Sequence, residues 1–381
     1  MNSRGQRLAG VGILAAARLP QGRYLGALAG LGAVALGASA VRGLLEGRDL
    51  PPPGNLYWGM ARSHTQGMNP ARTLALLAGL GDACFASTVN MACGSSLQAL
   101  VQAAEGLALG RPGTLLAGGS EAMSDTPHLL PGLRRGLRMG HREAPDVMIQ
   151  DGLRCPVTGL LMGETVERLA ARHGITREEA DAFALASHHR AAAADFRAEL
   201  RPLPELDRDE CVRPGDTLEA LAALKPVFHP QGQITAGNAS ALSDGAAALL
   251  LGGGPPSAWI GRLLGWAEAA VDPLDMGEAP VPAIRALLQR CGLAPSDVDL
   301  WEINEAFAAQ VLVCARQLDL PLDRLNVAGG GVALGHPIGA SGARIVVTLL
   351  HQLRARGGGL GVAALGIGGG LGLAVLVEAR P

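Results

Sequence analysis

The chain has 381 residues, of which 48% are hydrophobic and 17% are charged. This composition supplies enough apolar material for two or three packed domains and excludes an intrinsically disordered protein. The formal net charge is −2. The sequence therefore shows no excess of positive charge that would favour binding to nucleic acid or to an anionic membrane surface.

The cysteines show neither CxxC spacing nor pairing with histidine at the spacing of metal ligands. We therefore expect no metal site and no disulfide framework, and we place the protein in a reducing cytoplasm. The six cysteines are Cys84, Cys93, Cys155, Cys211, Cys291 and Cys314.

Three apolar segments raise the question of a membrane or a secretory signal. Residues 24–41 and 357–377 lack charge but are rich in glycine and alanine, which favours packed strands, turns and helices over a membrane span. Residues 8–17 follow Arg4 and Arg7 as in a signal peptide. The residues that follow indicate a turn and further folded chain, so we predict that residues 8–17 form a first buried strand.

Apolar runs typical of buried strands alternate with helical patterns, as in the helix-like residues 95–110 followed by the run at 115–119. This alternation predicts an α/β protein. AGGSEAM at 117–123 is repeated as AGGGVAL at 328–334, and Asn90 and Asn304 precede the two copies by similar distances. We therefore predict two similar halves with a site at their junction.

The first half carries a long insertion. We assign residues 1–124 and 244–264 to the N-terminal half, 125–243 to an inserted loop domain and 265–381 to the C-terminal half. Within the insertion, Thr176 and Glu179 form a capping box that predicts a helix from Thr176 to about Glu199. The arginine-rich stretch 134–142 is either a solvated face or the mouth of a pocket for an anionic ligand.

Cys93 is the best candidate for a nucleophile. Apolar residues at helical spacing begin just after it, at Leu97, Leu100 and Val101, so Cys93 lies at a strand-to-helix turn. Free N–H groups and the dipole at a helix N-terminus stabilise a thiolate, and we therefore expect a lowered pKa. The alternative is a structural cysteine in the core, as we expect for Cys291 and Cys314.

His336 is the matching candidate for a base. It lies with Pro337 in GGGVALGHPIGASGARI, residues 329–345. Glycines at this density let the backbone approach a reacting centre, and the proline stiffens the turn of the histidine. The duplicated half is expected to place His336 opposite Cys93.

Together these motifs resemble the thiolase family, the acetyl-CoA acetyltransferases and 3-ketoacyl-CoA thiolases. The resemblance covers nearly the whole chain and rests on five motifs: VNMACGSSLQAL at 89–100, LMGETVE at 161–167, ITAGNASALSDGAAA at 234–248, EINEAFAAQ at 302–310 and the His336 loop. It implies a duplicated five-layer αβαβα fold with an inserted loop domain. It also implies acyl-CoA and CoA as substrates, no permanently bound cofactor, a homodimer or homotetramer, and a place in fatty acid metabolism.

The resemblance further implies roles for individual residues. Cys93 would be acylated and His336 would be the base that activates it. Asn304 would hold a water that joins His336 in one oxyanion hole, and the backbone N–H groups of Cys93 and Gly368 would form a second. Contacts to CoA and substrate, each with ordinary packing as the alternative, are implied for Arg213 near the adenine, for Met162, Phe228, Ala236 and Ser240 along the pantetheine, and for Phe307 near the thioester.

One departure from the family bears on the chemistry. Active members carry a second cysteine in CIGGGQG, which moves the α-proton during carbon–carbon bond formation or cleavage. Here the motif reads GIGGGLG, with Gly366 in place of that cysteine. Losing a positioned acid/base costs about 10²- to 10⁴-fold.

We therefore predict an acyltransferase that acylates Cys93 and is impaired in carbon–carbon chemistry. The alternatives are an acyl-CoA hydrolase or other acyl-transfer enzyme, and a catalytically silent CoA-binding subunit. A cysteine restored at position 366 would raise cleavage of acetoacetyl-CoA if only the acid/base is missing. Cys155, which replaces a usually acidic residue, could act as a relocated acid/base only if the insertion folds it onto Cys93.

Overall fold

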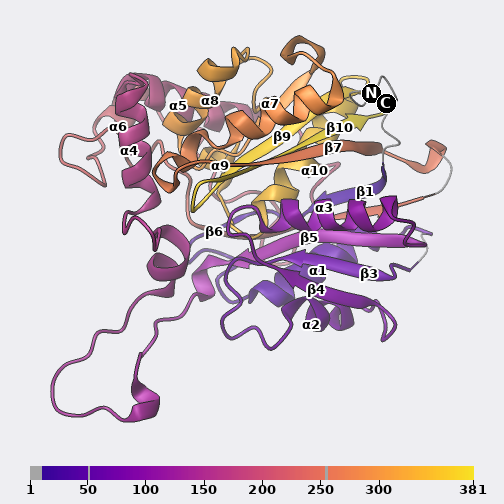
Figure 1. Ribbon diagram of the computed structural model, residues 1–381, viewed down its shortest axis with the longest axis horizontal. Helices are drawn as coiled ribbons and strands as arrows, with labels where there is room; N and C mark the ends of the chain where they lie inside the picture. The colour runs from indigo at the N-terminus through magenta and orange to yellow at the C-terminus, as the bar shows by residue number, and fades with distance from the viewer. Residues whose placement is uncertain (1–10, 50–51, 254–255) are drawn as a thin grey trace.

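The computed structural model describes residues 11–49, 52–253 and 256–381. Its strands form one hydrogen-bonded path in the order β4-β3-β5-β6-β1-β7-β10-β9-β8, and β2 pairs with β6 (Figure 1). The strands are β1 (Val11–Arg18), β2 (Gly22–Arg23), β3 (Asn55–Gly59), β4 (Phe85–Val89), β5 (Thr114–Ala122), β6 (Ser243–Gly252), β7 (Gly261–Ala270), β8 (Leu300–Ile303), β9 (Gly359–Ile367) and β10 (Leu371–Ala379).

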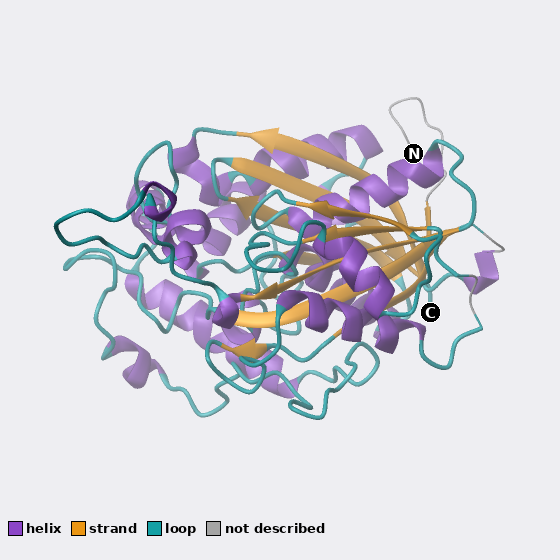
Figure 2. Ribbon diagram, turned by 90° about the horizontal axis from the view of Figure 1, so that it is seen from below, coloured by secondary structure: helices purple, strands orange, loops and turns teal. Residues whose placement is uncertain are grey.

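Helices cover both outer faces of the strands and fill the space between the two halves (Figure 2). The helices are α1 (Ala33–Leu45), α2 (Pro70–Leu77), α3 (Ser95–Ala108), α4 (Met162–Arg172), α5 (Arg177–Ala193), α6 (Leu218–Ala222), α7 (Pro280–Cys291), α8 (Ala308–Leu318), α9 (Gly331–Leu334) and α10 (Ser341–Ala355).

Three large hydrophobic clusters pack the helices against the strands. In the central core, Leu100 of α3 and Leu350 of α10 pack with strand residues from both halves. Helices α1 and α2 bury Leu36 and Leu74 against the outer face of the first half. Helices α7 and α8 bury residues such as Ile284 against the outer face of the second half. The predicted αβαβα order is therefore confirmed.

The duplication is present, but the equivalence that we predict within it is wrong. The first half has the strand order β3-β5-β6-β1, and the second half repeats it as β8-β9-β10-β7. Residues 117–119 lie in β5, whereas 328–330 lead into the short helix α9, and β9 holds the equivalent place. Asn304 follows β8, the counterpart of β3, so its partner in the first half is the loop that contains Arg62. Cys93 and His336 are the true counterparts, because they precede the two central helices.

The inserted region contains α4, α5, α6 and a long loop that projects from the body (Figure 1). The Thr176 hydroxyl accepts from the N–H of Glu179, whose carboxylate accepts from the N–H of Thr176. This confirms the predicted capping box. The helix ends at Ala193 rather than near Glu199, because the following chain turns back and Glu199 pairs with buried Arg18 at 2.5 Å.

The division between the halves follows the strand pairing. Strand β7 pairs with β10 from Gly261 to Ala270, so a boundary after residue 264 would cut a strand. We propose that the second half begins before Gly261. Strand β6 begins at Ser243, one residue before the proposed return to the first half.

The apolar segments form ordinary elements of the fold. Residues 33–41 lie in α1, and residues 359–367 and 371–377 lie in β9 and β10. In the part of the chain that the structure describes, no helix is both long and apolar enough to cross a membrane. Strand β1 is buried as predicted from Gly12 onward, and residues 8–10 of the expected strand lie outside the described residues.

Candidate active site

The candidate residues follow strands whose carboxyl ends share an edge. Strand β3 pairs in parallel with both β4 and β5, and β8 pairs in parallel with β9. Because parallel strands end at the same edge of a sheet, the loops that follow them lie together. Cys93 follows β4, Asn304 follows β8 and Gly368 follows β9. His336 enters from the loop before α10.

Cys93 lies on a strained turn at the start of α3. Ala92, just before it, has φ +45°, a left-handed conformation that alanine rarely adopts. The Ser95 hydroxyl holds this turn, because it accepts from the N–H of Met91 at 2.9 Å and donates to the carbonyl of Ala92 at 2.6 Å. The turn leaves Cys93 partly exposed, whereas the five other cysteines are buried.

The pKa of the Cys93 thiol differs from our expectation. Burial of the sulfur raises the pKa, although the backbone N–H of Gly368, the charge of Arg62 and the N–H of Cys93 itself lower it in part. The expected low pKa is therefore wrong, because desolvation outweighs the helix N-terminus. Cys93 rests as a thiol and needs a base to become a nucleophile.

His336, the candidate for that base, is held in place by Ser341. Its Nδ1 lies 2.5 Å from the Ser341 hydroxyl, which in turn donates to the carbonyl of Pro337 at 2.9 Å. The Ser341 oxygen therefore accepts from Nδ1–H, so Nε2 carries no hydrogen and its lone pair can accept one. Burial, together with the smaller effect of the charges of Arg344 and Arg62, lowers the pKa of His336 to about 3. The imidazole is neutral throughout the physiological range.

Ser341 positions the histidine, so its replacement tests this arrangement. We expect Ser341→Ala to lower the rate of Cys93 acylation about 10-fold, because Nδ1 loses the acceptor that fixes the tautomer. Ser341→Thr retains the hydroxyl and should preserve more of the rate if it fits the buried site. Stopped-flow release of CoA measures both. An unchanged rate in Ser341→Ala would show that Ser341 has no part in orienting the base.

Asn304 joins β8 to the base. Its backbone N–H donates to the carbonyl of Ala364 on β9 at 2.9 Å, and its Nδ2 lies 3.4 Å from His336 Nε2. Its Oδ1 is buried and has no partner among the described residues. The amide and the imidazole are thus side by side, and the water that Asn304 would hold stays a prediction.

Four of the predicted substrate-binding residues lie near Gly368 or near one another, and two are placed differently. A Cβ placed on Gly368 would lie 3.4 Å from the sulfur of Met162. The rings of Phe228 and Phe307 pack edge to face at 6.3 Å, and the N–H of Ser240 donates to the carbonyl of Ala306 beside Phe307.

Two predicted binding residues are placed differently. Ala236 is exposed on the neighbouring turn. Arg213 pairs with Asp216 at 2.7 Å, and its N–H donates to His188. It makes no recorded contact with the group around Gly368.

Gly366 is enclosed by backbone. A Cβ at this position would lie 2.7 Å from the carbonyl oxygen of Met276, closer than side chains approach in folded proteins.

Cys155 makes local contacts. Burial opposes its ionisation, but the N–H and hydroxyl of Thr158 lower the pKa of the thiol below its ordinary value. No recorded contact joins it to Cys93.

Sequence reasoning missed three residues of the site. Ser341 follows His336 by five residues. A hydroxyl in such a glycine-rich loop could have been predicted as a hydrogen-bond partner of the histidine. Glu121, at the end of β5, is buried and accepts from the N–H groups of Ala61, Arg62 and Gly339. Arg62 follows buried β3, and its position beside Cys93 depends on the parallel pairing of β3 and β4.

Comparisons with known proteins agree with this geometry. Residues 11–253 match the family model "Thiolase, N-terminal domain" and residues 257–379 match "Thiolase, C-terminal domain". The chain belongs to the thiolase family. It is 46% identical to an acetyl-CoA acetyltransferase of Pseudomonas aeruginosa, over 95% of this chain and 98% of the relative.

Solved thiolase structures superpose on nearly the whole chain. An acetyl-CoA acetyltransferase of Bacillus anthracis has a TM-score of 0.93 at 39% identity, covering 98% of this chain and 99% of that one. The human mitochondrial 3-ketoacyl-CoA thiolase in complex with CoA has a TM-score of 0.93 at 36% identity, with the same coverage. Within the described residues of our chain, no group of three His, Cys, Asp or Glu side chains could hold a metal ion.

Proposed function

We propose that this thiolase is an acetyl-CoA C-acyltransferase that acts through an acyl-enzyme on Cys93. The observation that carries the proposal is a Cys93 thiol whose sulfur meets the backbone N–H groups of Cys93 and Gly368, in a chain that also holds a neutral His336 with a fixed tautomer. Those N–H groups would donate to the thioester oxygen as it gains negative charge, and the amide of Asn304 beside His336 would take part in a second oxyanion hole.

Acylation follows from these positions. His336 Nε2 takes the proton of the Cys93 thiol as the sulfur attacks the thioester carbonyl, and the tetrahedral oxyanion is held by the two N–H groups. The carbon–sulfur bond to CoA then breaks, and His336 returns the proton to the departing CoA sulfur. The products are acyl-Cys93 and free CoA, and the reverse sequence regenerates the thioester.

CoA is a substrate in this proposal, and the chain needs no resident cofactor. A solved relative holds CoA in its structure, and Met162, which lies beside Gly368, would contact the pantetheine next to the reacting sulfur.

We also propose a cytoplasmic homodimer or homotetramer. Several apolar side chains of the projecting loop are exposed and suit a contact between copies, and light scattering measures the assembly. They are Leu129, Leu130, Leu133, Leu137 and Met139.

Carbon–carbon chemistry is impaired in this proposal, because no cysteine stands at position 366. Transfer of an acyl group between thiols needs no proton from the α-carbon, so it survives without that residue. Exchange of labelled CoA into acetyl-CoA, together with an intact-mass adduct on Cys93, tests the acyl-transfer half. Absence of both the exchange and the adduct would favour a silent CoA-binding protein, and release of free acetate would favour a hydrolase.

A cysteine at position 366 does not fit this backbone without movement. We expect Gly366→Cys to lower the free energy of unfolding by about 1–3 kcal/mol, because its Cβ meets the carbonyl of Met276 and the segment Pro273–Glu278 must shift. Cleavage of acetoacetyl-CoA should therefore rise by less than the roughly 10²- to 10⁴-fold that a positioned acid/base supplies.

Gly366→Ala is the matched control, since it adds the same Cβ without a thiol. Urea unfolding and cleavage assays compare the two variants with the parent. Full cleavage activity at unchanged stability in Gly366→Cys would show that the segment yields freely and that only the thiol is missing.

A further inference from the structure

Arg62 is a buried cation that the proposed reaction does not use. It follows β3, and its side chain is only 2% exposed. None of its three guanidinium nitrogens makes a hydrogen bond to another described residue. A buried guanidinium without hydrogen-bond partners is costly and calls for an explanation.

Glu121 does not account for Arg62. The nearest atoms of the two groups, Arg62 Nε and Glu121 Oε1, are 3.6 Å apart, beyond hydrogen-bond distance and unlike the bidentate geometry of a close ion pair. The Glu121 oxygens already accept from three backbone N–H groups, and burial raises the pKa of this carboxyl despite them and the charge of Arg62. The donors of Arg62 therefore remain available to another acceptor.

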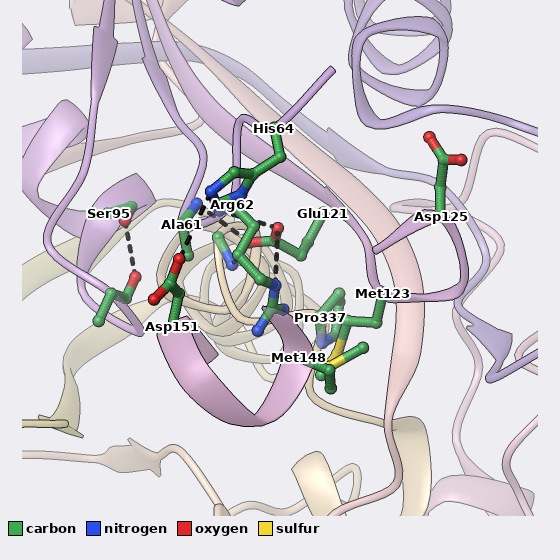
Figure 3. A network of polar contacts seen from close by, with 12 residues as sticks. Ala61, Arg62, His64, Ser95, Glu121, Met123, Asp125, Met148, Asp151 and Pro337 are labelled. Carbon is green, nitrogen blue, oxygen red and sulfur yellow. Dashed lines mark hydrogen bonds and ion pairs between the residues drawn. The ribbon is translucent and has the colours of Figure 1, made fainter. Parts of the chain in front are cut away.

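The guanidinium lies beside the reacting groups. Figure 3 shows the side chain passing Glu121, with its end directed to the side where Met148 and Pro337 lie. A Cβ on Gly152 would lie 2.0 Å from one terminal nitrogen of Arg62, so the guanidinium packs against the backbone of the segment Ile149–Leu153. Its charge lowers the pKa of both Cys93 and His336.

Apolar side chains pack between Cys93 and this segment. Met148, Met123 and Ile338 form a buried cluster against which Cys93 and Leu153 pack. The more exposed pair of His64 Nε2 and Asp151, 3.4 Å apart, stands next to Arg62 (Figure 3). An acyl chain on Cys93 that ran along the methionines would have a cation near its far end.

We propose that Arg62 binds a carboxylate at the far end of the acyl chain, so that the preferred substrates are CoA thioesters of dicarboxylic acids. The assignment rests on the proposed acyl transfer at Cys93 and adds its substrate class. A guanidinium fork matches a carboxylate with two parallel N–H···O bonds, and desolvation at this position strengthens them. The methylene groups between the two ends would pack against the apolar cluster of Met148, Met123 and Ile338.

Matched pairs of thioesters test this assignment. Succinyl-, glutaryl- and adipyl-CoA are compared with butyryl-, pentanoyl- and hexanoyl-CoA, which have the same chain lengths and no carboxylate. We expect acylation of Cys93, followed by CoA release and intact mass, to favour the carboxylate in at least one pair by roughly 10- to 100-fold. No preference in any pair overturns the proposal.

Variants of Arg62 separate recognition from a general electrostatic role. Arg62→Leu should abolish the preference within each matched pair. Acetyl-CoA, which has no tail to bind, should still acylate Cys93, at a rate altered by loss of the charge that lowers the pKa of Cys93 and His336. Arg62→Lys should retain a smaller preference because it keeps the charge without the fork. Arg197→Leu, at an exposed ion pair, is the matched control and should change nothing. A preference that persists in Arg62→Leu, or an equal loss for every thioester, overturns the proposal.

Binding separates this proposal from the proposed function. In Cys93→Ala, calorimetry measures the affinity of each thioester without any reaction. A carboxylate preference in binding supports Arg62 even if no acyl-enzyme forms in the parent. Acetylation of Cys93 without a carboxylate preference in rate or affinity would leave the acyltransferase standing and remove the role of Arg62.

Discussion

Cys93→Ala is expected to lose acetyl exchange by about 10⁴-fold or more, the scale seen when a catalytic nucleophile is removed. The other cysteines cannot replace it, because Cys93 is the one, among the described residues, whose sulfur meets the Gly368 N–H, and the five others are buried. The rate of labelled CoA exchange and the intact mass after incubation with acetyl-CoA measure the loss.

Cys291→Ala is the matched control for this variant. Cys291 is buried at the end of α7, away from the site, so its removal should leave the mass adduct and the exchange rate intact. Cys155→Ala should do the same, because the contacts of Cys155 are local. An adduct that persists in Cys93→Ala would place the nucleophile elsewhere and contradict the account.

His336→Asn is expected to lower acylation at pH 7 by about 10²- to 10⁴-fold and to change its dependence on pH. In the parent, burial keeps the pKa of His336 near 3, so the base is unprotonated between about pH 5 and 8. Titration of His336 should therefore leave the acylation rate independent of pH in this range. Without the base, acylation depends on the small fraction of Cys93 thiolate, and the rate should rise about tenfold per pH unit.

Single-turnover acylation across pH 5–9 measures both profiles. His189→Asn, on the exposed side of α5, should keep the flat profile of the parent. If the parent instead lost activity on acidification with a midpoint near 6.5, His336 would titrate as an ordinary histidine. The proposed buried, neutral base would then be wrong.

His336 also links stability to pH. Its folded pKa of about 3 lies below the ordinary histidine pKa of 6.5, so below pH 6.5 the unfolded chain binds a proton that the folded chain does not. The contribution of this group to stability is therefore complete above pH 6.5 and is lost as the pH falls toward 3. His336→Asn lacks this dependence.

The sequence predicted the main features of the fold because its signals are local. Alternating apolar runs predicted the α/β class, and Thr176 with Glu179 marked the start of α5 by direct side-chain capping. The equivalence of the halves was missed, because similar short motifs at 117–123 and 328–334 do not occupy equivalent places, and strand order is a property of long-range pairing.

In the site, too, local motifs could be predicted and the effects of long-range packing could not. Cys93, Asn304 and His336 could be named from motifs, and the structure brings Asn304 to His336 at 3.4 Å. The raised pKa of Cys93 could not be predicted, because it depends on how much chain folds over the sulfur. Arg62 was missed because its burial follows from the packing of Gly152, which lies far along the sequence.

The central claim is that this thiolase retains thioester transfer and has lost efficient carbon–carbon cleavage. The most direct test measures, on one preparation, the exchange of labelled CoA into acetyl-CoA and the CoA-dependent cleavage of acetoacetyl-CoA. The account predicts exchange with an acyl-Cys93 adduct, and cleavage slower than exchange by about 10²- to 10⁴-fold. Cleavage as fast as exchange would contradict it, because another group would then move the α-proton in place of a cysteine at Gly366.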